Sequence, residues 1–265
     1  MPRDRASDRQ LSGRVALVMG ASRRGAIGAA ICRALAERGA DIFFTHWRPF
    51  DATQPAGIDA DGPAALAEEL RALGVRCDEL EADLGDPDAP ARVLDSCAER
   101  LGPPTILVNN AAYSRRAGYD TLDAATRDAH YGVNIRGATL LSVLFARGYT
   151  DDGNARGRIV NLTSGQSLGP MVGELAYIAT KGAVEALTVT LAAELAGRGI
   201  TVNAVDPGPT DSGWMTAEVK QELLTLSSRG RLGLPADAAR LVAFLASDEA
   251  AWISGQIIHS RGGFA

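Results

Sequence analysis

One stretch decides the fold of this chain: LVMGASRRGAIG, residues 17–28. It places Gly20, Gly25 and Gly28 between an apolar run, RVALVMG, and a segment with apolar side chains at helical spacing, IGAAICRALAERGA. A buried strand, a glycine-rich turn and a helix together offer free N–H groups to a phosphate. The glycines are spaced G-x4-G-x2-G, however, and not G-x-G-x-x-G. Taken alone, the stretch therefore fits a nucleotide loop and an ordinary turn equally well.

Apolar runs alternate with helical patterns along the rest of the chain. We expect strands at residues 14–20, 40–47, 75–83, 104–112, 157–164, 199–208 and 255–260. Helices are expected at 27–40, 63–74, 88–102, 121–148, 174–197 and 235–247, a long loop at 47–63 and a looser segment at 208–234. The strands read as continuous apolar runs, which is typical of a sheet covered on both faces. This order predicts an α/β fold, a Rossmann-like doubly wound parallel sheet of about seven strands with helices on both faces.

Length and composition limit the possible classes of protein. No second domain boundary or repeat is visible in the 265 residues, so we expect a single domain over 13–265 after a loose tail at 1–12. The net charge of −5 is not typical of a nucleic-acid-binding protein, so no nucleic-acid partner is expected. No apolar run reaches the ~20 residues of a membrane span, and no secretory signal is visible, so a cytoplasmic protein is expected. Cys32, Cys77 and Cys97 are typical of buried thiols, and no metal site is expected.

A second motif, SGQSLGPMVGELAYIATK, supplies candidate chemistry. Tyr177 and Lys181 are four residues apart in an expected helix and share one face of it, and Ser164 ends a strand thirteen residues before the tyrosine. Of the 27 Lys and Arg side chains, only Lys181 and Lys220 are lysine. A lysine in so arginine-rich a chain indicates chemistry that a guanidinium does not serve, because an ammonium is a compact charge with rotatable donors.

At these residues the chain resembles the short-chain dehydrogenase/reductase family, whose signature is Tyr-x3-Lys with a Ser about thirteen positions earlier. The resemblance runs from about residue 13 to residue 263 and extends to 3-oxoacyl reductase-like members. It implies hydride transfer between a nicotinamide cofactor and a ketone or secondary alcohol, with Tyr177 as general acid/base. A nearby cation favours the tyrosinate, so Lys181 is expected to lower the pKa of Tyr177.

The resemblance also implies roles for other residues. Ser164 orients and polarises the substrate oxygen, and Lys181 also binds the nicotinamide ribose. Asn134 matches the family's helix asparagine, which holds a water in the proton relay. A helix asparagine satisfied by backbone is the alternative, and spacing does not separate the two.

The cofactor site is expected at the carboxyl ends of the strands, where the glycine loop becomes a lengthened version of the family's T-G-x3-G-x-G. Ala26 stands where the family has a glycine, and Gly25 is the substitute that the sequence offers. The NNAA segment likewise carries Ala112 in place of glycine. The implied contacts, with Tyr177 and Lys181, are Gly20, Ser22, Arg23, Arg24, Ile27, Arg48, Asp83, Leu84, Asn110, Ala111, Ala112, Pro207, Gly208 and Thr210.

NADP(H) is expected to be preferred, with NAD(H) possible. An NAD-specific site carries an acid at the end of the second strand, and here the first acid is Asp51, well into the following loop. Arg23, Arg24 and Arg48 are candidates to bind a 2′-phosphate, since guanidinium groups suit phosphate oxygens. Solvated arginines on surface loops are the alternative for each of them.

The substrate site is expected between residues 165–174 and 208–234. Trp214 and Met215 are candidates for its apolar wall, and Gln166 and Glu174 for its polar one, beside Ser164. Long helices rich in Ala and Leu, at 121–148 and 174–197, predict a homotetramer or homodimer. Two other functions stay open: a non-catalytic dinucleotide-binding sensor, and an epimerase or lyase that uses transient oxidation.

Overall fold

A seven-stranded sheet forms the centre of the computed structural model, which describes residues 9–54, 57–151, 153 and 157–264. Its strand order is β3-β2-β1-β4-β5-β6-β7, and every neighbouring pair is parallel. The strands are β1 Val15–Met19, β2 Asp41–His46, β3 Cys77–Glu81, β4 Ile106–Asn109, β5 Gly157–Leu162, β6 Ile200–Asp206 and β7 Ile257–His259. The expected doubly wound parallel sheet is confirmed.

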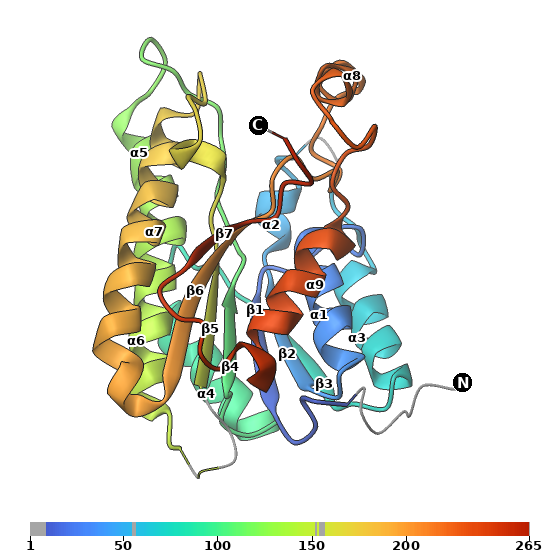
Figure 1. Cartoon of the computed structure of the whole chain (residues 1–265), viewed down its shortest axis with the longest axis vertical. Helices are drawn as coiled ribbons and strands as arrows, with labels where there is room; N and C mark the ends of the chain where they lie inside the picture. Colours follow the sequence, from blue (N-terminus) through green and yellow to red (C-terminus); the bar gives the residue numbers. More distant parts are fainter. Residues whose placement is uncertain (1–8, 55–56, 152, 154–156, 265) are drawn as a thin grey trace.

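Helices cover both faces of the sheet, as Figure 1 shows. One face is covered by α1 Ile27–Ala36, α3 Gly62–Ala72 and α9 Pro235–Leu245. The other is covered by α4 Ala89–Arg100, α6 Ala138–Gly148 and α7 Leu175–Leu195, with α5 Ala124–Tyr131 packed against α7. Alternate side chains of β1 enter the two cores: Ala16 and Val18 one, Leu17 and Met19 the other. Because both faces are buried, the strand shows no polar alternation.

The order of the strands reverses between β1 and β4, and this fixes where a ligand binds. In an open parallel sheet, ligands occupy the crevice outside the carboxyl ends of the strands at such a switch point. The chain segments that follow β1, β4 and β5 all meet at this edge of the sheet. They contain the glycine loop, the NNAA segment and Ser164.

Two segments expected to lack helix contain one. The loop at 47–63 begins with α2 Arg48–Asp51, and the segment at 208–234 contains α8 Ala217–Thr225. Thr216 caps α8 by accepting a hydrogen bond from the N–H of Val219. Between α5 and α6 the chain forms a π-helix, η1 Gly132–Gly137, so the expected long helix is interrupted there. The structure also contains short 3-10 turns at η2 Gly165–Ser167, η3 Ala196–Arg198 and η4 Asp248–Ala250.

The expected loose tail is packed where the structure describes it. Leu11 is fully buried, and its N–H donates to the carbonyl of Arg38 at the end of α1. Residues 1–8, the rest of this expected tail, lie outside the described residues.

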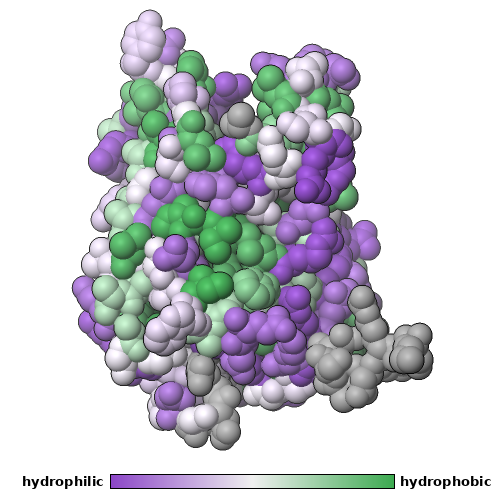
Figure 2. Space-filling view, viewed as in Figure 1, coloured by the Kyte–Doolittle hydropathy of each residue, from purple (hydrophilic) through white to green (hydrophobic). Residues whose placement is uncertain are grey.

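Two apolar features remain at the surface. Among the described residues, one helical stretch, Leu175–Arg198, is long and apolar enough to cross a membrane by length and composition alone, although no such span was expected from the sequence. It consists of α7 and η3, and α7 packs against β6. Hydrophobic side chains also gather over the middle of the face in Figure 2, where β7 forms the edge of the sheet.

Candidate active site

Ser164, Tyr177 and Lys181 come together at the carboxyl end of β5. Ser164 follows the strand by two residues, and the other two lie one turn apart at the start of α7. The Ser164 side chain lies beside the hydroxyl group of Tyr177. The Nζ of Lys181 lies 5.6 Å from the centre of the Tyr177 ring and donates to the carbonyl of Leu162 at 2.7 Å. The sequence spacing therefore brings the three groups to one site.

Burial dominates the acid–base properties of this group. It raises the pKa of Tyr177 to about 12, and the carboxylates of Glu174 and Asp206 act in the same direction. Burial also lowers the pKa of Lys181 to about 8. Contrary to the expectation, the pKa of Tyr177 is raised and not lowered, and burial is the largest cause. Both shifts favour the uncharged forms.

Asn134 lies in η1 and is fully engaged by neighbouring groups. Its amide nitrogen donates to the carbonyl of Tyr113 and to the hydroxyl of Thr180, each at 3.0 Å. Its amide oxygen accepts from the N–H of Tyr113 at 2.7 Å. The side chain therefore joins the loop after β4 to α7, which agrees with the structural alternative for this asparagine.

The glycine loop is shaped by close backbone approach. Gly20 has a φ of +83°, and a Cβ there would lie 2.8 Å from the Cα of Ala111. A Cβ on Gly28 would clash with the carbonyl of Gly20, whereas Gly25 faces open space. Asn110 donates to the carbonyl of Gly20 at 2.7 Å and so ties the loop to the end of β4.

The residues present fit the pyrophosphate of a dinucleotide. Helix α1 begins at Ile27, and its N-cap, Ala26, makes no side-chain cap. The first N–H groups of α1 are therefore left for an anion, as at other helix N-termini that bind phosphate. At the adenosine side, Leu84 is buried and the carboxylate of Asp83 accepts from the N–H of Gly85 at 2.7 Å.

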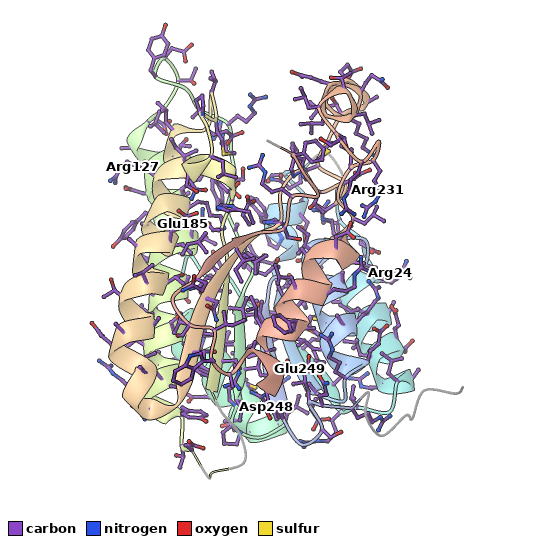
Figure 3. The ribbon with its side chains drawn as sticks, viewed as in Figure 1. Arg24, Arg127, Glu185, Arg231, Asp248 and Glu249 are labelled. Carbon is purple, nitrogen blue, oxygen red and sulfur yellow. The ribbon has the colours of Figure 1, made fainter. Side chains whose placement is uncertain are left out.

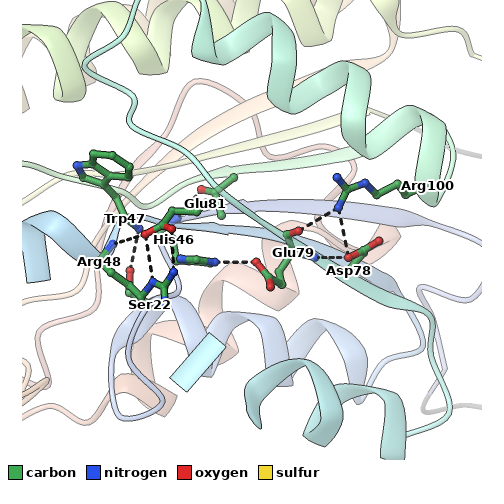
Figure 4. Close-up of polar contacts among 10 residues, drawn as sticks. Ser22, His46, Trp47, Arg48, Asp78, Glu79, Glu81 and Arg100 are labelled. Carbon is green, nitrogen blue, oxygen red and sulfur yellow. Dashed lines mark hydrogen bonds and ion pairs between the residues drawn. The ribbon is translucent and has the colours of Figure 1, made fainter. Parts of the chain in front are cut away.

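The three arginines proposed for the 2′-phosphate each face a carboxylate. Arg23 lies 3.8 Å from Asp51, Arg24 3.4 Å from Asp59, and Arg48 2.9 Å from Glu81. The last contact is drawn in Figure 4 beside the bond that the N–H of Trp47 donates to Ser22. Ser22 therefore holds the glycine loop against the start of α2.

Asp51 lies closer to the cofactor region than its position in the sequence indicated. Helix α2 turns back beside the end of β2, so Asp51 is buried and lies beside Ser22. Burial raises the pKa of this carboxyl group, while Ser22, Arg23 and His46 act in the opposite direction. An acidic side chain is therefore present beside the glycine loop after all, and it faces Arg23 at 3.8 Å.

The loop after β6 is ordered by its own hydrogen bonds. Pro207, Gly208 and Thr210 directly follow the strand, and the Thr210 hydroxyl donates to the carbonyl of Pro207 at 2.9 Å. The Trp214 indole donates to the carbonyl of Thr210 at 3.1 Å and is half exposed, whereas Met215 is buried.

The polar substrate candidates differ in how they are placed. The Gln166 amide donates to Glu185 on α7 at 2.6 Å, so the expectation that it faces a substrate is not supported. The Glu174 carboxylate pairs with Arg116 at 3.4 Å and has one buried oxygen without a partner among the described residues. Glu174 therefore remains a candidate wall of the site.

Two contributors escaped the sequence analysis. The Sδ of Met171 lies 3.9 Å from the Ser164 hydroxyl oxygen, within the segment assigned to the substrate site but without a motif. Tyr113, directly after the NNAA segment, packs between Phe50 of α2 and His130 of α5, with ring centres 5.2 and 4.8 Å apart. The contact between Tyr113 and Phe50 depends on how α2 packs in the folded protein, and the sequence alone does not indicate it.

Comparison with known proteins identifies the class. Residues 20–265 match the family model described as enoyl-(acyl carrier protein) reductase. The chain is 52% identical to the "Uncharacterized oxidoreductase YjdA" of Bacillus subtilis, over 95% of this chain and 96% of the relative. It is 37% identical to the 3-oxoacyl-[acyl-carrier-protein] reductase FabG of Pseudomonas aeruginosa, over 96% and 98% of the two chains.

Solved structures agree with this result. A short-chain dehydrogenase from Burkholderia cenocepacia in complex with NADP is 35% identical and superposes with a TM-score of 0.85, over 96% of this chain and 98% of that one. The protein belongs to the short-chain dehydrogenase/reductase family. It is an oxidoreductase of this family with 3-oxoacyl reductase-like relatives, and its cofactor is a nicotinamide dinucleotide.

Proposed function

We propose that this protein is an NADP(H)-dependent reductase that interconverts a ketone and a secondary alcohol, with residues 13–265 as one catalytic unit. The observation that carries the proposal is that Ser164, Tyr177 and a buried Lys181 lie together at one site. It lies at the same edge of the sheet as the glycine loop. A proton donor and a cofactor loop at one switch point are the two parts that carbonyl reduction needs.

Tyr177 is the proton donor in this mechanism. Its raised pKa keeps the hydroxyl protonated at neutral pH, which is the state required to protonate the oxygen of a reduced carbonyl. When bound, the nicotinamide supplies or accepts the hydride at the substrate carbon. Ser164, which lies beside Tyr177, directs a second donor at the same oxygen. In the oxidative direction Tyr177 has to lose its proton, and a protonated Lys181 favours that step.

NADP(H) is the cofactor that we propose. The Burkholderia cenocepacia relative was solved in complex with NADP. Arg23 and Arg48 flank the end of β2 and offer guanidinium groups, and their carboxylate partners Asp51 and Glu81 hold them in place. The carboxylates also reduce the net positive charge, so the preference is expected to be moderate.

Consumption of external NADPH separates this function from its alternatives. The purified protein is incubated with NADPH or NADH and a panel of ketones that includes 3-oxoacyl thioesters, and cofactor loss is followed with product formation. We expect alcohol to form in a one-to-one ratio with the NADPH consumed. A non-catalytic sensor consumes none, and an epimerase or lyase converts its substrate without net consumption. Either result would refute the proposal.

We also propose that the protein is a homotetramer or homodimer. The support is an apolar surface on α6 and α7: Leu140 and Leu175 are exposed, and 52% of Val189 is accessible. Exposed apolar side chains on long helices are typical of subunit interfaces, and most such assemblies have closed symmetry.

A further inference from the structure

A cavity lined by arginines adjoins the site described above, and Pro207 and Pro209 of the loop after β6 form part of its wall. It is about 250 Å³ in volume and is formed by the segment that joins α8 to α9 together with the last residues of the chain. Four guanidinium groups line it, those of Arg229, Arg231, Arg240 and Arg261. Figure 3 shows Arg231 between α8 and the start of α9.

The charges in this cavity are not balanced. Asp237 is the one carboxylate among the described residues that line it. It is shared by Arg231, at 2.7 Å, and Arg240, at 2.5 Å, and it also accepts from the N–H of Leu234. Arg229 makes no hydrogen bond or ion pair within the described part of the chain. The cavity therefore carries surplus positive charge.

Arg261 links the cavity to the loops of the active site. Its side chain is 16% exposed, lies 3.6 Å from Asp206, and has a buried Nε without a hydrogen-bond partner among the described residues. A Cβ on Gly208 would lie 2.8 Å from the Cγ of Arg261, and one on Gly165 would clash with its guanidinium group. Gly165 directly follows Ser164, so Arg261 packs against the loops on both sides of the proposed catalytic hydroxyl.

Arg231 is held in place before any ligand binds. Ser227 binds both the N–H and the carbonyl of Arg231, at 3.2 and 2.7 Å. The guanidinium of Arg231 also donates to the carbonyl of Leu232 at 2.8 Å. Preorganised guanidinium groups bind the oxygens of phosphate well, because each offers several donors in a fixed plane.

We propose that the cavity lined by Arg229, Arg231, Arg240 and Arg261 is a binding site for a phosphate oxyanion, either free or carried by a substrate. Because Arg261 packs against the loops that bear Ser164 and Gly208, phosphate binding in the cavity alters the position of these loops. The binding step does not depend on the proposed function, whereas the kinetic readout rests on it.

The binding step is tested by thermal unfolding with inorganic phosphate. Saturating NADP+ is present so that the cofactor's own phosphate sites are filled, and sodium chloride at equal ionic strength is the reference. We expect a saturable rise in Tm of a few degrees. Arg229→Ala should weaken phosphate binding by about tenfold, because it removes one charge-assisted contact. Arg229 is chosen because its replacement breaks no described ion pair.

Arg127→Ala is the matched control. Arg127 is an exposed arginine on α5, on the opposite side of the view in Figure 3 from Arg231. It should leave the phosphate response unchanged. Equal responses to phosphate and chloride, or a response that survives in Arg229→Ala and in Arg240→Ala, would overturn the proposal. Failure of carbonyl reduction with an intact phosphate response would overturn only the proposed function.

Kinetics distinguish the two sources of the anion. If the anion is free, phosphate alters kcat or KM for a neutral ketone in the wild type and not in Arg229→Ala. If the substrate carries it, Arg229→Ala raises KM for a phosphorylated ketone, free phosphate competes with that ketone, and a neutral ketone is unaffected. Both patterns support the site. Identical kinetics of wild type and variant in every arm would contradict the link to the active site.

Discussion

Lys181 shows how much the chemistry of the site depends on one residue. The chain uses arginine for nearly every cation, yet the position one turn after Tyr177 is a lysine that is 4% exposed and bonded to the carbonyl of Leu162. A guanidinium is larger, stays protonated and presents a rigid fork, so it fits neither the space nor a proton-transfer role.

Lys181→Arg is therefore expected to lower kcat by about 10²-fold or more, as loss of acid–base assistance does. Lys220→Arg is the control, since this second lysine lies on α8 and pairs with Asp211 at 2.8 Å. Steady-state rates of NADPH oxidation measure both variants. A Lys181→Arg enzyme with nearly wild-type turnover would show that only the positive charge matters.

The burial of Lys181 also has a consequence for stability. Its pKa is lowered from 10.5 to about 8, so between these values the unfolded chain binds more protons and the folded state gains stability as the pH rises. Each pKa unit corresponds to ~1.4 kcal/mol, so the free energy of unfolding rises by about 3 kcal/mol over this pH range.

Lys181→Met removes this dependence. The stability of the methionine variant relative to wild type should therefore fall by about 3 kcal/mol between pH 7 and pH 10.5. Urea denaturation of the ligand-free proteins at both pH values measures it. Lys220→Met, at a side chain that is 39% exposed, should show little change. If the two variants behave alike, burial does not control the ionisation of Lys181.

Among the elements, α2 has the largest effect on the cofactor site. It occupies four residues of a segment that reads as a loop because of its Pro, Gly and Asp content. By turning back beside β2, it brings Asp51 to Ser22 and Arg23 and places Phe50 against Tyr113. We therefore expect cofactor choice to depend on α2 as well as on the terminal residue of β2.

Arg23→Ala, Arg24→Ala and Arg48→Ala are expected to identify the arginines that bind the 2′-phosphate. At least one should lower kcat/KM for NADPH by about tenfold and leave NADH nearly unchanged, because charge-assisted bonds contribute ~1.5–3 kcal/mol. Asp51→Asn should raise the NADPH preference, since it removes a negative charge near that phosphate.

Arg76→Ala is the matched control for cofactor choice. Arg76 pairs with Asp41 at 2.8 Å, at the opposite end of β2. The kcat/KM values for both cofactors on one ketone provide the measurement. A wild type that favours NADH, or arginine variants that all behave like Arg76→Ala, would contradict the assignment.

Five of the seven described strands were predictable because they are short, buried apolar runs bounded by turn residues. The edge strands β3 and β7 are less buried, and β3 has the largely charged sequence CDELE. The Ser164, Tyr177 and Lys181 group was predictable because helical spacing alone places the last two on one face. The partners of Arg23 and Arg48, the direction of Gln166 and the π-helix at Gly132–Gly137 were not, since each depends on contacts between segments distant in sequence.

At the scale of the whole molecule, the parallel sheet brings every functional loop to one edge and leaves α6 and α7 with apolar side chains in solvent. Val189→Glu should shift the protein toward smaller species, because it places a charge in the expected interface. Light scattering with size-exclusion chromatography measures the mass. Val172→Glu, at a valine that is 84% exposed outside α6 and α7, should leave it unchanged. A monomeric wild type at micromolar concentration would refute the assembly.

The most direct test of the whole account is Tyr177→Phe, assayed for ketone reduction and for NADPH binding on the same preparation. Phenylalanine preserves the ring beside Lys181 and removes only the hydroxyl, which lies beside Ser164. The account predicts a loss of turnover of about 10²–10⁴-fold. It also predicts an NADPH dissociation constant within a few-fold of wild type. Turnover near the wild-type rate would contradict the assignment of Tyr177 as the proton donor.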